Sequence, residues 1–396
     1  MLSMKVLHVV PDDKFWKPVI AIFNRIEVEN EYVSILEDNE QLLYIDSDQI
    51  VPITEEDASS LWKRSDVDVY VFHSIPVKNY DRILSVGKDK TVIVVSWGYD
   101  IYYSQNGCPP LLPLALYKPL TIRLMNRMER VPFWTAIKRC VKRMVYCEKS
   151  RKYSEAKKRW QTITQQKQRK AIDRVDYWAT ILPNEYEMLK DNLGMQARYL
   201  PFHYSGTSRA TKYPRIDTHK ACDILIGNSA DPSNNHIDVI DLLRKRGIKN
   251  KLYLPMAYDD DVYRSHVSKY LIKHSIESEI QQELLSPSDY REKLLNCRAA
   301  VFGHIRQQAI GNIVICMRSG IKVFLFKDSV AYKFFKSIGS YVFSIEEDLT
   351  VGEIGMPLTE EENEVNLQKL DWLSLEEIVS RLKPIFKGIE EQIVNG

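Results

Sequence analysis

Short apolar runs alternate with amphipathic stretches along the first part of the chain. Runs rich in β-branched residues predict buried strands at 5–10, 31–36, 42–45, 67–72 and 91–96. The helical spacing of apolar positions predicts helices at 15–29 and 79–86, between these runs. Such alternation is typical of a doubly wound α/β fold with a parallel sheet.

A second series of the same kind begins after residue 220. It predicts strands at 222–226, 251–256, 298–303, 322–326 and 341–344, and helices at 236–246, 289–296, 308–318 and 330–337. Gly247 and Gly320 follow two of these helices and are expected to end them. A capping-box pattern at residue 374 predicts a last helix, with a kink expected at Pro384.

The two series predict two Rossmann-like domains that face a central cleft. We expect an N-terminal acceptor-binding domain at 1–205, a polar linker at 206–220, a C-terminal nucleotide-sugar-binding domain at 221–372 and a closing helix at 373–396. The pattern at 109–174 changes to a long basic helical region, which is interpreted as an insertion in the first domain. Ligands in such sheets bind at the carboxyl ends of strands, so the cleft is the expected site.

Length and composition agree with this division. A chain of 396 residues is too long for one ordinary core. Its six cysteines are scattered without zinc-ligand spacing, which favours a reducing cytosol and no structural metal. The N-terminus lacks a secretory cleavage site, and the longest apolar stretch, 309–326, contains Arg318 and Lys322. The protein is therefore expected to be cytoplasmic, either soluble or peripheral on a membrane.

Charge is placed very unevenly along the chain. The net charge is +2, but 118–174 holds 18 Lys or Arg against four acids, or +14, which leaves −12 for the rest. Such a segment is a membrane surface, a solvated face or a nucleic-acid surface. Its aromatic residues and the Leu-rich run at 109–120 favour an anionic membrane over nucleic acid. The cations expected to face the membrane or acceptor are Lys138, Arg139, Lys142 and Arg143.

The sharpest local pattern is the strand-to-helix turn at 224–236. A strand ends at Gly227, a loop of small and amide residues follows, and a helix begins near His236. Backbone N–H groups and the positive end of a helix dipole would suit a diphosphate there, although the same residues also serve as helix caps. The candidate donor-binding residues of this turn are Gly227, Asn228, Ser229, Ser233, Asn234, Asn235 and His236.

A second turn of this kind runs from 302 to 312. Arg306 stands just before the expected helix, where a guanidinium can pair with phosphate oxygens. Gln307 and Gln308 can bond sugar or base, whereas Arg306 and His304 can also be an ordinary surface cation and a loop histidine. The candidate donor-binding residues here are His304, Arg306, Gln307, Gln308, Gly311 and Asn312.

The first domain offers candidates for acid–base chemistry. His73 and Asp100 each come just after an expected buried strand, and either could take the proton from an acceptor hydroxyl or simply brace its loop. Trp97 beside Asp100 is a candidate for acceptor or membrane contact, and 12–13 is a weaker acidic candidate. Two DxD patterns, at 46–48 and 66–68, lack other evident ligands, so no metal and no cofactor are expected.

The motifs at 227–236, 254–256 and 306–311, with the Trp97-Gly-Tyr-Asp100 segment, resemble the TDP-N-acetylfucosamine:lipid II N-acetylfucosaminyltransferase family, glycosyltransferase family 56. The resemblance covers most of the chain in order. It implies a GT-B fold, donor binding in the C-terminal domain without a DxD metal, and a TDP-linked amino sugar such as 4-acetamido-4,6-dideoxygalactose as donor. It also implies a polyprenyl-diphosphate-linked glycan as acceptor, in the synthesis of enterobacterial common antigen or a related bacterial surface polysaccharide.

Two features depart from that family. The basic stretch at 148–174 is extended, and alanine occupies positions 230 and 309, where the family often has glycine. From the residue patterns and the resemblance together, we expect a metal-independent glycosyltransferase that is peripheral on the inner face of the cell membrane. The alternatives are a transferase of another nucleotide sugar, such as a fucosyltransferase, or a non-catalytic protein that binds an anionic membrane or nucleic acid. A dinucleotide-binding oxidoreductase is disfavoured because the GxGxxG fingerprint is absent.

Overall fold

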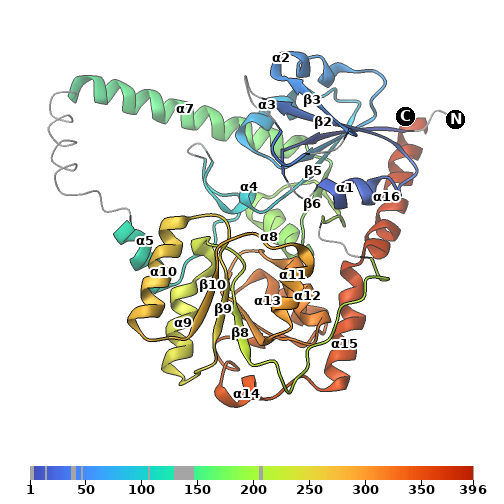
Figure 1. The fold of residues 1–396 in the computed structure, drawn as a ribbon. Helices are drawn as coiled ribbons and strands as arrows, with labels where there is room; N and C mark the ends of the chain where they lie inside the picture. The colour runs from blue at the N-terminus through green and yellow to red at the C-terminus, as the bar shows by residue number, and fades with distance from the viewer. Residues whose placement is uncertain are drawn as a thin grey trace. The chain divides into compact units, whose positions relative to one another are not determined.

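The protein is described by a computed structural model, in which two compact units can be distinguished. The described residues are 4–13, 16–36, 42–45, 48–105, 108–128, 147–204 and 208–395, with the backbone alone for 147–159. Unit 1 comprises Met1–Pro113, Val141–Arg209 and Trp372–Gly396, and unit 2 comprises Leu114–Cys140 and Ala210–Asp371. Each unit is built around its own parallel sheet (Figure 1).

The sheet of unit 1 has seven parallel strands in the order β3-β2-β1-β4-β5-β6-β7. The strands are β1 (Lys5–Val10), β2 (Glu29–Leu36), β3 (Ile50–Thr54), β4 (Val69–His73), β5 (Thr91–Val95), β6 (Tyr177–Ala179) and β7 (Arg198–Leu200). The order reverses between β1 and β4, as in the doubly wound nucleotide-binding fold. The doubly wound α/β class expected from the sequence is confirmed.

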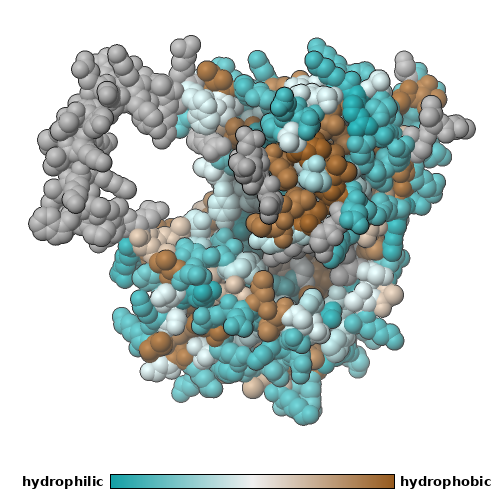
Figure 2. Space-filling model, turned by 45° about the horizontal axis from the view of Figure 1, so that its top comes forward, coloured by the Kyte–Doolittle hydropathy of each residue, from teal (hydrophilic) through white to brown (hydrophobic). Residues whose placement is uncertain are grey.

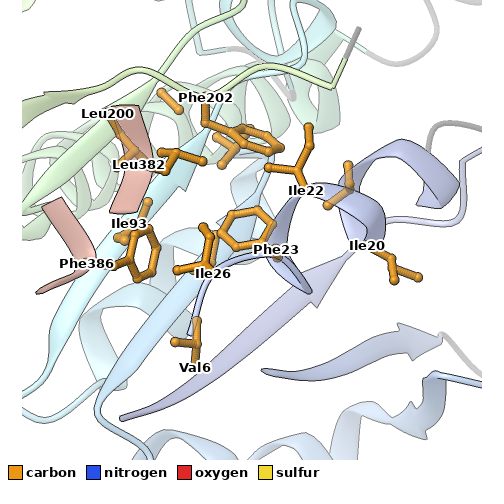
Figure 3. Packing of buried hydrophobic residues seen from close by; sticks show 14 of the residues in the cluster. Val6, Ile20, Ile22, Phe23, Ile26, Ile93, Leu200, Phe202, Leu382 and Phe386 are labelled. Atoms are coloured by element: carbon orange, nitrogen blue, oxygen red, sulfur yellow. The ribbon is translucent and has the colours of Figure 1, made fainter. Parts of the chain in front are cut away.

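The helices of unit 1 cover this sheet and complete its core. They are α1 (Trp16–Phe23), α2 (Glu55–Ala58), η1 (Leu61–Lys63), α3 (Val77–Ser85), α4 (Tyr99–Tyr102), α7 (Cys147–Arg174), α8 (Pro183–Leu193) and α16 (Leu375–Asn395). In one hydrophobic cluster, Phe23 of α1 meets Phe202 and Phe386, and the last of these comes from α16 (Figure 3). The C-terminal helix is thus part of the core of unit 1.

The sheet of unit 2 has six parallel strands in the order β10-β9-β8-β11-β12-β13. Its strands are β8 (Asp223–Ile226), β9 (Leu252–Pro255), β10 (Ser278–Gln281), β11 (Cys297–Phe302), β12 (Lys322–Leu325) and β13 (Phe343–Ser344). Its helical segments are α5 (Pro119–Met128), η2 (Pro232–Asn234), α9 (His236–Lys245), α10 (Asp261–Lys273), α11 (Pro287–Leu294), α12 (Ile310–Arg318), α13 (Val330–Ser337), α14 (Val351–Gly355) and α15 (Glu360–Leu370). A short η3 (Asp371–Leu373) spans the unit boundary.

The region 109–174 is divided between the two units, which differs from the insertion expected in the first domain. Helix α5 packs on unit 2, because the Asp238 carboxylate of α9 accepts hydrogen bonds from the backbone N–H groups of Leu120 and Thr121, both at 2.8 Å. The backbone N–H of Lys118 donates to Asn235 Oδ1 at 2.7 Å. The described part of α7 instead lies against α3 of unit 1, through Gln168 among others.

Other expectations were wrong in detail. The strand expected at 42–45 is a loop, and the third strand is β3 instead. The loop forms because the Asp12 carboxylate accepts hydrogen bonds from three consecutive backbone N–H groups, those of 43–45. Strand β10 and helix α10 were not expected. Among the described residues, no helix is long and apolar enough to cross a membrane.

Candidate functional site

The two turns singled out in the sequence flank the topological switch point of unit 2. The first turn follows β8 and the second follows β11, and these neighbouring strands lie where the strand order reverses. Their carboxyl ends therefore meet at one edge of the sheet. In open α/β sheets this is the usual position of a ligand site.

Left-handed backbone shapes the first turn. Gly227 has φ +67°, and a Cβ there would approach Asn234 Oδ1 to 2.5 Å and His236 Nε2 to 2.7 Å. Asn235, which precedes α9, also has positive φ, at 51°. The Asp231 carboxylate accepts a hydrogen bond from the Ser233 N–H at 2.7 Å, which supports the short η2. Glycine and asparagine are the residues that tolerate this conformation, so the sequence dictates the turn.

Side-chain hydrogen bonds link the first turn to the second. His304 Nε2 lies 2.7 Å from Asn234 Oδ1 and 3.1 Å from Asn228 Oδ1. Gln308 Nε2 donates to Asn228 Oδ1 at 3.1 Å, and Ser233 Oγ donates to Gln308 Oε1 at 2.6 Å. Since amide oxygens only accept, His304 Nε2 carries the proton in these contacts. We call these five residues the amide network.

The backbones of the two turns also touch. A Cβ on Gly303 would lie 2.3 Å from the backbone oxygen of Asn234 and 2.9 Å from Val239 Cγ2. Asn235 Nδ2 donates to the carbonyl of Gly303 at 2.7 Å and to that of Leu116 at 3.0 Å. Position 303 therefore requires glycine for close approach, whereas a Cβ on Gly311 would meet no atom within 4 Å.

Burial divides the candidate donor-binding residues into two groups. The buried group supports the turns from inside; its members are Gly227, Ser229, Ser233, Asn234, Asn235, His236, His304, Gln307 and Gln308. The group with solvent-accessible surface is Asn228, Arg306, Gly311 and Asn312. The residues of the second group offer the larger accessible surface to a ligand.

The N-terminus of α12 lies at this edge of the sheet. Its N-cap residue, Ala309, has φ +57° and gives no side-chain capping hydrogen bond. Arg306, three residues earlier, is partly exposed, and its Nη1 donates to the Gln307 carbonyl at 3.1 Å. A guanidinium next to a helix N-terminus without a side-chain cap is a favourable environment for an anion.

Burial holds both histidines of the turns neutral. The pKa of His236 is lowered to about 3 by desolvation. The pKa of His304 is lowered well below its ordinary value, first by burial and then by the charge of Arg306. Neutral rings suit their hydrogen bonds within the turns, and neither ring adds positive charge for a phosphate.

In unit 1, Asp100 braces two loops. Its Oδ2 accepts the N–H of Ile75 at 3.0 Å and its Oδ1 accepts the N–H of Trp97 at 2.9 Å. The carboxyl is 3% exposed, and burial raises its pKa to about 6. Such a pKa suits a general base, but the two backbone bonds give the side chain a structural role.

His73 lies in the core and not at a surface. Its ring is fully buried beside Trp16 and Trp97, and its Nε2 lies 3.1 Å from Nδ1 of His8. His8 Nε2 in turn lies 3.0 Å from Asn30 Oδ1, and burial lowers the pKa of both histidines, that of His8 to about 4. His73 also belongs to the lining of a cavity of unit 1, and its role as a base stays a prediction.

The membrane and acceptor candidates have different outcomes. Trp97 is 6% exposed and stacks on Tyr204 with ring centroids 4.8 Å apart, so it is a core residue and not a surface anchor. The interpretation of Trp97 as a membrane contact is corrected for that reason. Lys138, Arg139, Lys142 and Arg143 lie outside the described residues.

The chain is similar to one known family over part of its length. Residues 162–354 match the family model described as 4-alpha-L-fucosyltransferase, glycosyl transferase group 56. Over these residues, just under half of the chain, the protein is similar to the group 56 glycosyltransferases. The match runs from within α7 to α14, so it includes both turns at the switch point of unit 2. The resemblance expected from the sequence is confirmed.

Solved structures similar to this chain have the GT-B fold. The lipopolysaccharide outer core galactosyltransferase WaaB in its apo form is 11% identical, covers 97% of this chain and 100% of its own, and gives a TM-score of 0.61. Sucrose-phosphate synthase from Thermosynechococcus elongatus is 8% identical, with 98% and 100% covered and a TM-score of 0.61. A glycosyltransferase from Rickettsia africae is 10% identical, with 98% and 99% covered and a TM-score of 0.59.

The acidic pairs of the chain have no metal-like arrangement where they are described. Asp66 forms an ion pair with Arg64 and lies 3.2 Å from the Lys5 ammonium. Asp46 lies outside the described residues. Across the part of the chain that the structure describes, no group of three His, Cys, Asp or Glu residues is placed to hold a metal ion.

Sequence reasoning missed two contributors to the site of this glycosyltransferase. Tyr258 accepts a hydrogen bond from Asn228 Nδ2 at 3.2 Å and extends the amide network towards β9. Asp238 fixes the N-terminus of α5, as described above. Neither residue belongs to a glycine- or amide-rich motif, and their roles depend on contacts with segments distant in the sequence.

Proposed function

We propose that the protein transfers a sugar from a TDP-sugar to a polyprenyl-diphosphate-linked glycan, at the inner face of the bacterial cell membrane and without a metal ion. The group 56 match and the GT-B fold support the transferase activity. The donor, the acceptor and the location are proposals that extend the family resemblance. In this reaction a nucleoside diphosphate leaves as the glycosidic bond breaks, so its developing negative charge must be stabilised.

The observation that carries the donor site is Arg306 beside the N-terminus of α12. The backbone N–H groups of the first helical turn and the guanidinium together supply positive charge at the switch point of unit 2. The amide network, in which all members except Asn228 are buried, holds this turn in place before the ligand arrives. A diphosphate bound here would be stabilised without a divalent cation.

A thermal-shift titration tests the donor proposal. We expect TDP to raise the unfolding temperature of the full chain, to the same extent with and without EDTA. A shift that requires Mg²⁺ contradicts metal independence. A larger shift with GDP than with TDP redirects the assignment to a transferase of another nucleotide sugar, such as a fucosyltransferase.

Replacement of Arg306 tests the residue itself. The change Arg306→Ala removes a charged partner of the diphosphate, so TDP affinity should fall about tenfold or more. Lys220→Ala removes a cation whose side chain is 86% exposed, and serves as the charge-matched control. Isothermal titration calorimetry measures both variants. Equal TDP affinity in wild type and Arg306→Ala would exclude Arg306 from the donor site.

Helix α7 supports the membrane part of the proposal. Between residues 147 and 174 the sequence holds ten Lys or Arg and three acids, or +7. Trp160 and Ile163, three positions apart on this helix, are 48% and 45% exposed. Exposed apolar residues on one helix face among many cations suit the surface of an anionic bilayer.

Vesicle binding tests this location. We expect co-sedimentation with vesicles rich in phosphatidylglycerol and little with phosphatidylcholine alone. The double change Trp160→Ala with Ile163→Ala should reduce it several-fold, while Ile272→Ala, which removes a 74% exposed side chain of unit 2, should not. Loss of vesicle binding on addition of a polynucleotide, with tight polynucleotide binding, would favour the nucleic-acid alternative.

A further inference from the structure

Unit 1 contains a cavity at its own topological switch point. It has a volume of about 350 Å³ and lies at the carboxyl ends of β1, β2 and β4, next to the first turns of α3. This volume is at the lower end of the range for small-ligand pockets. Of the candidate residues taken from the sequence, His73 and Asp12 belong to its lining.

The charged side chains of the cavity lining are already balanced. The carboxylate of Asp12 accepts the three N–H bonds of 43–45, at 2.6, 3.0 and 3.0 Å. The Arg82 guanidinium pairs with Glu55 through Nε and Nη2, and its Nη1 donates to Asn79 Oδ1 at 2.8 Å. Lys78 is exposed, so water screens its charge. The lining therefore presents little net charge to a ligand.

The remaining polar groups of the lining are neutral and alternate with apolar walls. Ser34 and Ser74 contribute hydroxyls, and Tyr99 contributes a phenol whose pKa is raised by burial of its hydroxyl, although the side chain as a whole is 43% exposed. Apolar wall comes from strand ends, such as Val10 and Leu36. A sugar ring has the same alternation, because its faces carry C–H groups and its edge carries hydroxyls.

We propose that this cavity binds one neutral pyranose ring of the acceptor glycan, while the diphosphate of the acceptor binds elsewhere. The inference rests on the proposed function and specifies the acceptor contact of unit 1. A neutral ring needs no counter-charge, and the paired state of Asp12 and Arg82 leaves none to offer. A diphosphate in the same place would bring two or more negative charges next to the Asp12 carboxylate.

Saturation-transfer NMR with the full chain tests the proposal, with free N-acetylglucosamine, N-acetylgalactosamine and glucose as probes. We expect saturation of the ring protons of at least one of them. The change Leu36→Trp fills the cavity from the half-buried end of β2 and should weaken this binding at least tenfold. Leu84→Trp, at a 39% exposed position of α3 outside the lining, is the matched control and should leave it unchanged.

A second variant covers the case in which Leu36→Trp does not fold. Tyr99→Phe removes only the phenol hydroxyl and should weaken sugar binding about threefold, with the thermal midpoint retained. Absence of binding by all three sugars, or binding unaffected by both Leu36→Trp and Tyr99→Phe, overturns the proposal. Displacement of the bound sugar by inorganic pyrophosphate also overturns it, because it would show an anion site.

The TDP titration separates this proposal from the proposed function. In Leu36→Trp the shift in unfolding temperature caused by TDP should equal that of the wild type, because the donor residues are in unit 2. Sugar binding that is lost while the TDP shift is kept locates the defect in the cavity. A wild type that binds sugar but no nucleoside diphosphate would contradict the donor proposal and leave the cavity assignment standing.

Discussion

The two units place different chemistry at the same topological position. Both sheets reverse their strand order between the first strand and the fourth, at β1 and β4 in unit 1 and at β8 and β11 in unit 2. In unit 1 this edge contains an open cavity whose charges are paired and whose other polar groups are neutral. In unit 2 the two turns are joined by the amide network, and the partly exposed Arg306 is the cation beside them.

The comparison shows how one fold presents two kinds of surface at the same topological position. A rigid set of backbone N–H groups favours an anion, because the positive ends of the dipoles are fixed before binding. An open cavity with hydroxyl and apolar groups favours a neutral ring. Fold alone therefore does not tell what either unit binds, and our proposals for the two units rest on the strand-end residues.

A substitution of Gly303 is the strongest test of whether the two turns of unit 2 are interlocked. The change Gly303→Ala would place a methyl group 2.3 Å from a backbone oxygen, which cannot move without shifting the first turn. We expect the free energy of unfolding, measured by urea denaturation, to fall by about 3 kcal/mol. TDP affinity should fall as well.

Gly311→Ala is the matched control for this prediction. A Cβ at that position meets no atom within 4 Å, and alanine is the better helix former, so stability should be unchanged or slightly higher. If both substitutions proved equally mild, the two turns of unit 2 would not be interlocked, and the contrast with unit 1 would be lost.

In unit 1, the buried carboxyl of Asp100 makes stability depend on pH. The folded protein holds this proton more tightly than the unfolded chain, since the pKa is raised from 3.8 to about 6. The free energy of unfolding should therefore decrease as pH rises from about 4 to about 6, by up to about 3 kcal/mol. Urea denaturation across this range measures the slope.

In the variant Asp100→Asn this decrease should be absent. The difference between the free energies of unfolding of the variant and the wild type should therefore shift in favour of the variant as the pH rises. Asp173→Asn, which alters an exposed carboxylate of α7, should show the wild-type slope. Parallel pH profiles for wild type and Asp100→Asn would contradict the raised pKa.

The smallest of these effects concerns the attachment of α5 to unit 2. The change Asp238→Ala removes the acceptor of the Leu120 and Thr121 N–H groups, so the free energy of unfolding should fall by about 1–2 kcal/mol. Asp289→Ala, at an exposed acidic position in the first turn of α11, should cost less. Equal losses would mean that α5 is held by its apolar side chains alone.

Sequence patterns predicted most strands and helices of both units, because the burial of these elements determines where apolar residues stand in the sequence. Strands such as β4 and β5 are buried on both faces, so their apolar runs are unmistakable. The loop at 42–45 was mistaken for a strand because its apolar residues are also short and consecutive. Its structure depends on Asp12, thirty residues earlier, which no local pattern reveals.

The candidate site shows a similar limit. The turns at 227–236 and 303–311 were found because glycine and amide residues are required by their backbone. The sequence did not distinguish buried Asn234 from partly exposed Asn228, since both amides look alike in a motif. The burial of His73 was not expected, because its neighbours in space, including His8 and Trp16, are distant in the sequence. The cavity of unit 1 has no motif, because it is formed by the ends of three strands.

Helix α16 has a consequence for biosynthesis. Its side chains Ile378, Leu382 and Phe386 belong to the same hydrophobic cluster as Phe23 of α1 (Figure 3). The chain forms unit 2 between these two elements. During synthesis, α16 therefore leaves the ribosome only after the whole of unit 2. Until then, the N-terminal part of unit 1 lacks the helix that completes its core. Hydrophobic residues of α1 stay exposed during that interval, when a chaperone would be needed most. Figure 2 shows a group of hydrophobic residues just right of the centre, in the upper half of the view.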